Sequence, residues 1–143
     1  MIKKRFLNQM LKKSVISLEN HPEYSAFPHW TYIVYKNEIV SIGLNRKYEP
    51  PITYGYHRSD DPTFIPKWHS ELDAIKKWNI RNSGFDIVNI RLNKSGDIRL
   101  SKPCKTCTKM LYFLNCRNAY FTTNNNEFDC ININLQSQNN ILI

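Results

Sequence analysis

The chain lacks the features that mark secreted and membrane proteins. It has only four cysteines in 143 residues, and no apolar run approaches the roughly 20 residues of a membrane span. Its basic N-terminus is not followed by a continuous apolar region or a small-residue cleavage site, so we read no signal peptide. Cysteines in such a chain are expected to be thiols or metal ligands, not disulfides. We therefore expect a cytoplasmic protein with no membrane partner.

Acidic residues are missing from the first part of the chain. Residues 1–13 contain no Asp or Glu, and they hold five basic residues: Lys3, Lys4, Arg5, Lys12 and Lys13. Without these five, 15 basic residues stand against 12 acidic ones, although the whole chain carries a net charge of +8. A basic excess favours nucleic-acid partners in general. Its confinement to one segment instead favours a solvated helix face, with a phosphate-binding face as the alternative.

The length predicts a single domain over residues 1–143, because a chain of this size buries one core and not two. Apolar residues between 2 and 18 recur at helical spacing, and Pro22 is expected to end that helix. A second helix is predicted from near Trp68 to a stop at 82–84. A third is predicted to open at Pro103, with Cys107 and Met110 on its buried face.

Five strands are predicted from β-branched and aromatic runs at 31–35, 39–44, 87–92, 119–122 and 127–133. The first two form a hairpin through a tight turn at 36–38. The last two are separated only by 123–126, and a parallel crossover needs a dozen or more residues, so strands four and five should be antiparallel. The element order predicts an α/β fold, a three-layer α/β/α sandwich with one mixed five-stranded sheet.

Two short motifs carry the chemistry, His69-x-Glu71 and Pro103-Cys104-x-x-Cys107. One His and two Cys supply three zinc ligands and leave a fourth position open, which is typical of a catalytic zinc. His69 and Glu71 are separated by about 200° around a helix, so both reach one point only from its first turn. We therefore expect the site at the facing N-terminal ends of two helices. Glu71 is then the base that moves protons during hydrolytic deamination.

This combination is typical of zinc deaminases that act on nucleobases. The chain resembles the cytidine and deoxycytidylate deaminase superfamily, most of all its short virus- or phage-encoded members. The resemblance implies the cytidine deaminase fold, a Zn²⁺ cofactor, and conversion of cytidine, deoxycytidine or dCMP to the uracil product with release of ammonia. A virus-encoded member would act in the host cytoplasm.

The resemblance also implies three substrate contacts. Asn45 ends a Gly-x-Asn stretch whose Asn contacts the sugar in nucleotide and tRNA deaminases; a strand-ending turn residue is the alternative. Ser70 stands where the superfamily usually has Ala, and its backbone N–H can bind the base. Ser101 resembles the Ser of Ser-x-Pro-Cys in polynucleotide cytidine deaminases, or it caps the following helix.

The stretch from Asn45 to Trp68 has no helical or strand period, and loops this long are usually functional. We expect it to wall the site and close over a small ligand, excluding water and blocking the passage of a strand. A free nucleoside or nucleotide is therefore the favoured substrate. Four side chains in this loop are candidates for a 5′-phosphate contact, with a solvated loop as the alternative: Arg46, Lys47, His57 and Arg58.

Two other functions stay open. One is deamination of cytosine or adenine in single-stranded DNA or RNA, which the net charge and Ser101 favour. The other is a non-enzymatic zinc module in which Cys116 or Cys130 completes a closed four-ligand site. We interpret these two cysteines instead as small buried hydrophobes. The sequence also leaves open a homo-oligomer.

Overall fold

The computed structural model describes residues 1–21, 28–45, 69–78 and 84–134. These ranges contain three helices and six strands. In chain order they are α1 (Lys4–Asn20), β1 (His29–Tyr35), β2 (Glu38–Leu44), α3 (Ser70–Trp78), β3 (Asp86–Leu92), β4 (Ile98–Arg99), α4 (Lys105–Phe113), β5 (Asn118–Thr122) and β6 (Phe128–Asn132). Within these ranges, no helix combines the length and apolar character needed to cross a membrane.

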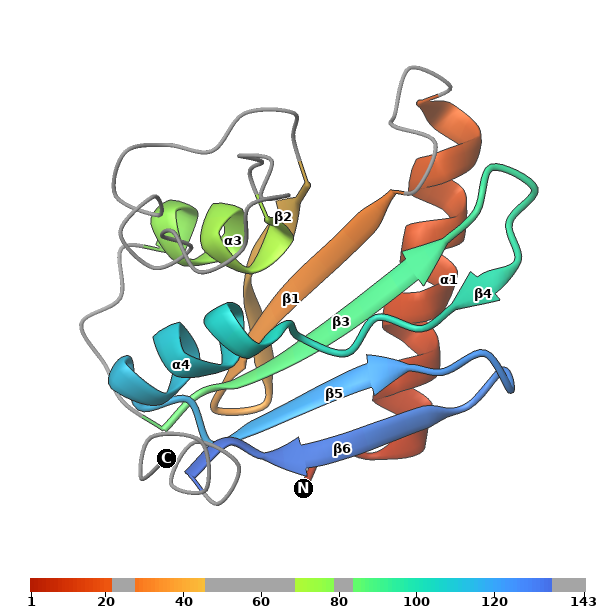
Figure 1. The fold of residues 1–143 in the computed structure, drawn as a ribbon. Helices are drawn as coiled ribbons and strands as arrows, with labels where there is room; N and C mark the ends of the chain where they lie inside the picture. Colours follow the sequence, from red (N-terminus) through yellow and green to blue (C-terminus); the bar gives the residue numbers. More distant parts are fainter. Residues whose placement is uncertain (22–27, 46–68, 79–83, 135–143) are drawn as a thin grey trace.

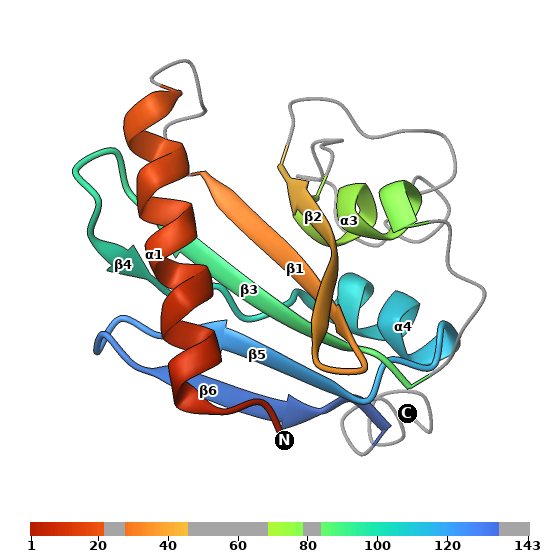
Figure 2. The ribbon, with the colours of Figure 1, turned by 180° about the vertical axis from the view of Figure 1, so that it is seen from behind.

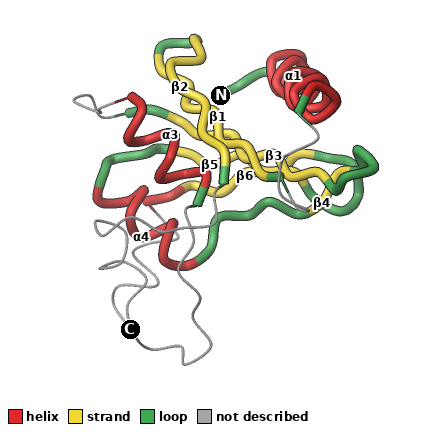
Figure 3. The backbone as a smooth tube through the Cα atoms, turned by 90° about the horizontal axis from the view of Figure 1, so that it is seen from above, coloured by secondary structure: helices red, strands yellow, loops and turns green. Residues whose placement is uncertain are grey.

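One mixed sheet forms the middle layer. Its strand order is β2-β1-β3-β5-β6, and β4 pairs with β3 off this path. Only the β3–β5 pair is parallel among the described strands; the others are antiparallel. α1 covers one face of the sheet, and α3 and α4 cover the other (Figures 1 and 2; Figure 3 shows the layers from above). The predicted three-layer α/β/α sandwich is confirmed.

The predicted hairpin at the end of the sheet is also confirmed. β5 and β6 are antiparallel, in a register that pairs Asn118 with Asn132 and Thr122 with Phe128. The first hairpin turns through Lys36 and Asn37, both with positive φ, which is the backbone that a two-residue hairpin turn requires.

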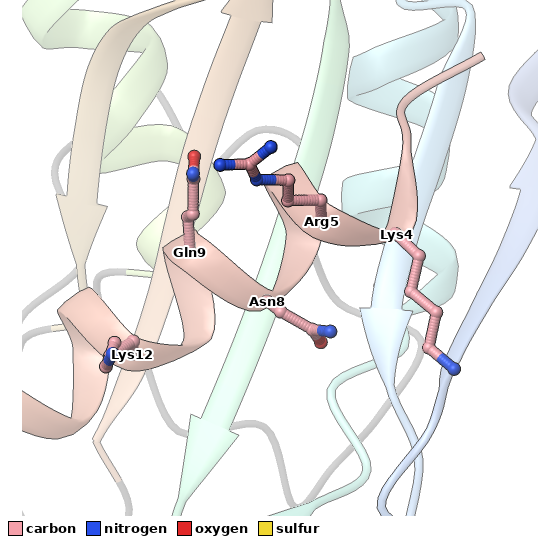
Figure 4. A pocket seen from close by; sticks show the side chains of 5 residues that line it. All are labelled: Lys4, Arg5, Asn8, Gln9 and Lys12. Atoms are coloured by element: carbon pink, nitrogen blue, oxygen red, sulfur yellow. The ribbon is translucent and has the colours of Figure 1, made fainter.

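The apolar stripe of α1 packs on the sheet as its spacing predicts. Leu7 and Met10 are buried against Trp30 and Val88, in a cluster that Phe6 and others flank. The opposite face of α1 is exposed and polar (Figure 4), and it presents Lys4, Arg5, Asn8, Gln9 and Lys12. This basic face lies across the sheet from α3 and α4.

The second core lies under α3 and α4. Ala74 and Leu111 are fully buried against Ile33 and Ile87. β2 lies unusually close to α3 at Gly43, where a Cβ would overlap the backbone oxygen of Ser70 and the backbone nitrogen of Ala74. Glycine at this position therefore lets α3 pack directly on the end of β2.

β4 is a correction to the predicted five strands. The sequence predicts only a turn at 94–97, yet Ile98 and Arg99 pair with the end of β3. Two residues are too few to show the alternation of a strand, so the sequence pattern does not predict β4. It brings the chain back along β3, and the Ser101 N–H then donates to the Thr122 carbonyl at 2.9 Å. The segment that leads into α4 is thereby fixed to the sheet.

The predicted helix starts differ slightly from the observed ones. α4 begins at Lys105 and not at Pro103, because Cys104 is its N-cap and accepts the Cys107 N–H through sulfur. α3 begins at Ser70. Trp68, Pro22 and the predicted stop at 82–83 lie outside the described residues.

Candidate active site

His69, Cys104 and Cys107 come together at the N-terminal ends of two helices. His69 immediately precedes α3, and its carbonyl accepts the Asp73 N–H at 3.1 Å. The His69 Nδ1 atom lies 3.2 Å from Cys107 Sγ and 3.9 Å from Cys104 Sγ. All three ligand atoms lie within 4.8 Å of one another, and no other such group of metal-ligating residues occurs in the described part of the chain. The helix-end geometry predicted from the motif spacing is thus observed.

The donor set and its dimensions suit zinc. Tetrahedral zinc with bonds of about 2.3 Å to sulfur and about 2.0 Å to nitrogen would hold S and N atoms about 3.5 Å apart. The two observed S···N distances, 3.2 and 3.9 Å, bracket that value. Cys107 is buried and Cys104 is exposed. A group held here can therefore be reached from the Cys104 side.

The Cys104 thiol is set up to ionise. Its hydrogen bond with the Cys107 side chain is the largest influence and lowers the pKa of Cys104 to about 4. Partial desolvation of the sulfur atom opposes this shift, while His69 and the Cys107 N–H, which donates to Cys104 Sγ at 3.3 Å, reinforce it. Metal ligation requires the thiolate form.

Glu71 is buried in the first turn of α3, with 2% of its surface exposed. Asn89 Nδ2 donates to its Oε2 at 3.1 Å, and Ser70 Oγ donates to its Oε1 at 3.2 Å. Burial by itself raises the pKa of this carboxyl. Charges on His29 and His69, the backbone N–H of Glu71 and the Asn89 amide outweigh burial, so the pKa of Glu71 lies below its usual value.

Solved structures share this fold, although no family model matches the chain and no curated protein matches it in sequence. One is the dCMP deaminase of the cyanophage S-TIM5 in complex with dCMP and dUMP. It aligns with a TM-score of 0.54 and 18% identity, over 85% of this chain and 83% of that chain. Its apo form gives 0.52 and 16%, over 84% of each chain. This chain has the dCMP deaminase fold. The resemblance stated from the motifs is confirmed for the fold.

The dCMP deaminase fold of this chain contains polar residues under Glu71 that the motifs do not predict. Asn89 on β3 and Thr31 on β1 are fully buried, and Thr31 Oγ1 donates to Asn89 Oδ1 at 2.6 Å. Ser70 Oγ lies 2.8 Å from Thr31 Oγ1. In the sequence both positions read as strand interior, so only their pairing across the sheet identifies them.

Asn45 lies just after β2 and joins the ends of β1 and β2. Its Oδ1 accepts the His29 N–H at 3.0 Å, and its own N–H donates to the His29 carbonyl at 3.2 Å. This is the strand-ending role that the sequence analysis keeps as an alternative. Its contact with a sugar stays a prediction.

His29 is a second residue that the sequence analysis missed. Its Nε2 is buried and is the one such side-chain nitrogen or oxygen in the described residues without a hydrogen-bond partner. Burial lowers the pKa of His29, and the charges on Arg91 and His69 lower it further. The Glu71 carboxylate and Cys104 oppose this shift. An unpartnered ring nitrogen thus lies near the proposed base and the ligand cluster. A lone His at the start of a strand carries no sequence signal of this kind.

Ser101 is engaged within the protein. Its Oγ donates to the Asn89 carbonyl at 2.8 Å, lies 2.7 Å from Thr122 Oγ1, and accepts the Thr122 N–H at 2.8 Å. The alternative that it caps the following helix is wrong, because Cys104 is the N-cap of α4. Its contact with substrate stays a prediction, as does that of the Ser70 backbone.

Cys116 and Cys130 lie apart from the ligand cluster. Cys116 belongs to the core under α3 and α4, and burial raises the pKa of its thiol well above the usual value. Cys130 packs against the core on the α1 side of the sheet. The candidate phosphate contacts Arg46, Lys47, His57 and Arg58 lie outside the described residues, as does all of the predicted Asn45–Trp68 lid after Asn45.

Proposed function

We propose that this protein is a zinc-dependent hydrolase that deaminates a free cytosine nucleoside or nucleotide, releasing ammonia and the uracil product. The observation that carries the proposal is the buried Glu71 carboxylate beside a convergent His-Cys-Cys cluster, at the facing ends of α3 and α4. A fully structural zinc site would have four protein ligands and would not require a carboxylate held next to it.

Each residue has a stated role in this proposal. His69, Cys104 and Cys107 would hold Zn²⁺, which when bound would acidify a water and supply positive charge for the developing oxyanion. Glu71 accepts a proton from the attacking water and delivers it to the ring nitrogen. Glu71 then transfers the second proton of that water to the amino group, which leaves as ammonia as the C–N bond breaks and the carbonyl forms, so both water protons are accounted for. Two helix N-termini favour the net negative charge that develops between them.

A small nucleotide is the substrate class we favour, and dCMP within it. The cyanophage dCMP deaminase of the same fold was solved in complex with dCMP and dUMP. The largest block of positive charge here lies on α1, across the sheet from the site. That block of charge therefore gives no support to a polymer bound at the ends of α3 and α4.

Ammonia release from zinc-loaded protein tests this function. The panel contains cytidine, deoxycytidine, dCMP, adenine counterparts and a cytosine-containing oligonucleotide. We expect turnover of the free cytosine compounds, highest for dCMP. Dominant turnover of the oligonucleotide would favour the polynucleotide alternative. No ammonia from any compound, with zinc bound, would favour the non-enzymatic module.

A further inference from the structure

A buried cluster of polar side chains surrounds the Glu71 carboxylate. Asn89 Nδ2 donates to Glu71 Oε2 at 3.1 Å, and Thr31 Oγ1 donates to Asn89 Oδ1 at 2.6 Å. The Ser70 hydroxyl lies 2.8 Å from Thr31 Oγ1 and 3.2 Å from Glu71 Oε1, and its single hydrogen can be donated to one of them. Each of these four side chains is at most 2% exposed. Hydrogen bonds in a buried cluster of this kind are stronger than in water, so they hold the side chains in place.

The two acceptors that face its Nδ2 fix the orientation of the Asn89 amide. Its Oδ1 therefore faces Thr31 and accepts the Thr31 hydroxyl hydrogen. The two Nδ2 hydrogens then have one acceptor each. One is Glu71 Oε2, and the other is the Ser101 carbonyl at 3.2 Å. A flipped amide would leave both acceptors without donors.

Asn89 therefore connects the two halves of the candidate site. It stands on β3 in the middle of the sheet, where its backbone is held on both sides. Through one hydrogen bond it holds Glu71 at the start of α3, and through the other it holds the segment that leads to Cys104 at the start of α4. The Asn89 amide thus fixes the starts of α3 and α4 relative to each other.

We propose that Asn89 is a positioning residue, which sets the direction of the Glu71 carboxylate relative to the His69, Cys104 and Cys107 cluster. Its catalytic part rests on the function proposed above. The same buried cluster also accommodates Ser70 at a position where the superfamily usually has Ala. The Ser70 hydroxyl is buried, and Thr31 and Glu71 provide its partners.

The first test does not depend on activity. A double-mutant cycle of Asn89→Ala and Glu71→Ala, measured by denaturant unfolding of the zinc-loaded protein, is expected to be non-additive. The matched control pairs Asn89→Ala with Ser14→Ala, which removes a buried hydroxyl bonded to Tyr32 on the opposite face of the sheet. That pair should be additive. Additivity of the Asn89–Glu71 pair would overturn the proposal even if the protein has no deaminase activity.

The second test separates positioning from general stability. Asn89→Asp keeps the size and an acceptor for Thr31, replaces both N–H donors, and places a second carboxylate beside Glu71 Oε2. We expect kcat to fall about 100-fold, with KM and zinc content close to wild type. Ser14→Ala should leave all three unchanged. If the Asn89 variants do not fold, Thr31→Val, which frees the amide to rotate, should lower kcat in the same direction. Wild-type kcat in a folded Asn89→Asp protein would refute the role.

Discussion

The two buried carboxylates in the first turn of α3 have different roles because they have different hydrogen-bond partners. Asp73 Oδ2 accepts the Leu44 N–H at 2.9 Å and pairs with Lys77 at 2.9 Å, so it fastens α3 to the end of β2. Glu71 has no lysine or arginine partner among the described residues and is held by neutral donors instead. A carboxylate held without a salt bridge remains available to exchange protons.

Glu71→Ala is expected to retain zinc and fold but to lose turnover by about 10²- to 10⁴-fold, the range for removal of a general acid–base group. Zinc content, unfolding temperature and kcat together check this. Glu19→Ala removes an exposed carboxylate on α1 and serves as the control. A Glu71→Ala protein with wild-type kcat would rule out the mechanism.

His29→Phe should have opposite effects on stability and binding. Removing a buried nitrogen without a partner relieves a cost of about 1–3 kcal/mol, so the ligand-free protein should be more stable. If a substrate atom is the missing partner, KM should rise about 2- to 10-fold with a smaller change in kcat. Melting curves and steady-state kinetics measure both. An unchanged KM would show that Nε2 does not contact substrate.

At the scale of elements, the packing of β2 on α3 sets where the site lies. Gly43 allows the backbone of α3 to rest on β2, and Asp73 bonds the same strand one residue later. These contacts fix the first turn of α3, which carries Glu71 and follows His69. The Gly-x-Asn stretch thus has a packing role that is independent of any contact with substrate.

Gly43→Ala should displace α3, because the added methyl would also lie 2.8 Å from the Ala74 Cβ. Overpacking against backbone is expected to cost about 1–3 kcal/mol or more of unfolding free energy. Turnover should fall with it, since the helix start moves. Gly96→Ala is the control: its Cβ meets nothing within 4 Å, so only its positive φ opposes the change. Equal effects of the two variants on turnover would contradict this account.

At the scale of the whole molecule, charge and chemistry lie on opposite faces of the sheet. The basic face of α1 is exposed, and the ligand cluster lies at the ends of the two helices on the other face (Figures 1 and 4). Attraction between the charges on α1 and a substrate at the ligand cluster is screened over about 8–10 Å at ordinary salt. We therefore do not assign the net charge of +8 to binding at the site.

Replacing Lys4, Arg5 and Lys12 by Gln should leave turnover of dCMP within about twofold of wild type, because screening weakens charges this remote. The same variant is expected to bind a single-stranded oligonucleotide more weakly and with a smaller salt slope, since fewer counterions are released. Kinetics and binding at two salt concentrations decide this. A large loss of dCMP turnover would place α1 in the substrate path.

Metal removal should affect the whole domain, because the three ligands join the starts of two helices. We expect one zinc per chain, and a chelator should lower the unfolding temperature and abolish turnover, both restored by added Zn²⁺. Metal analysis and melting curves give the result. Retention of zinc by Cys104→Ser together with Cys107→Ser would exclude the proposed ligands.

The helices, the two hairpins, the three-layer sandwich and the candidate ligands could all be predicted from the order of the residues. Those features depend on periodicity and on spacings of a few residues, such as His69-x-Glu71 or 123–126, and local geometry follows from them directly. β4, the Gly43 contact, and the placement of Asn89 and His29 become visible only in the folded chain. Thr31 and Asn89 are 58 residues apart in the chain, and Asn89 and Glu71 are 18 apart. A polar residue inside a strand gives the same sequence signal whether it is isolated or belongs to a buried polar cluster. Its partners are set by the pairing of strands and not by its neighbours in the chain.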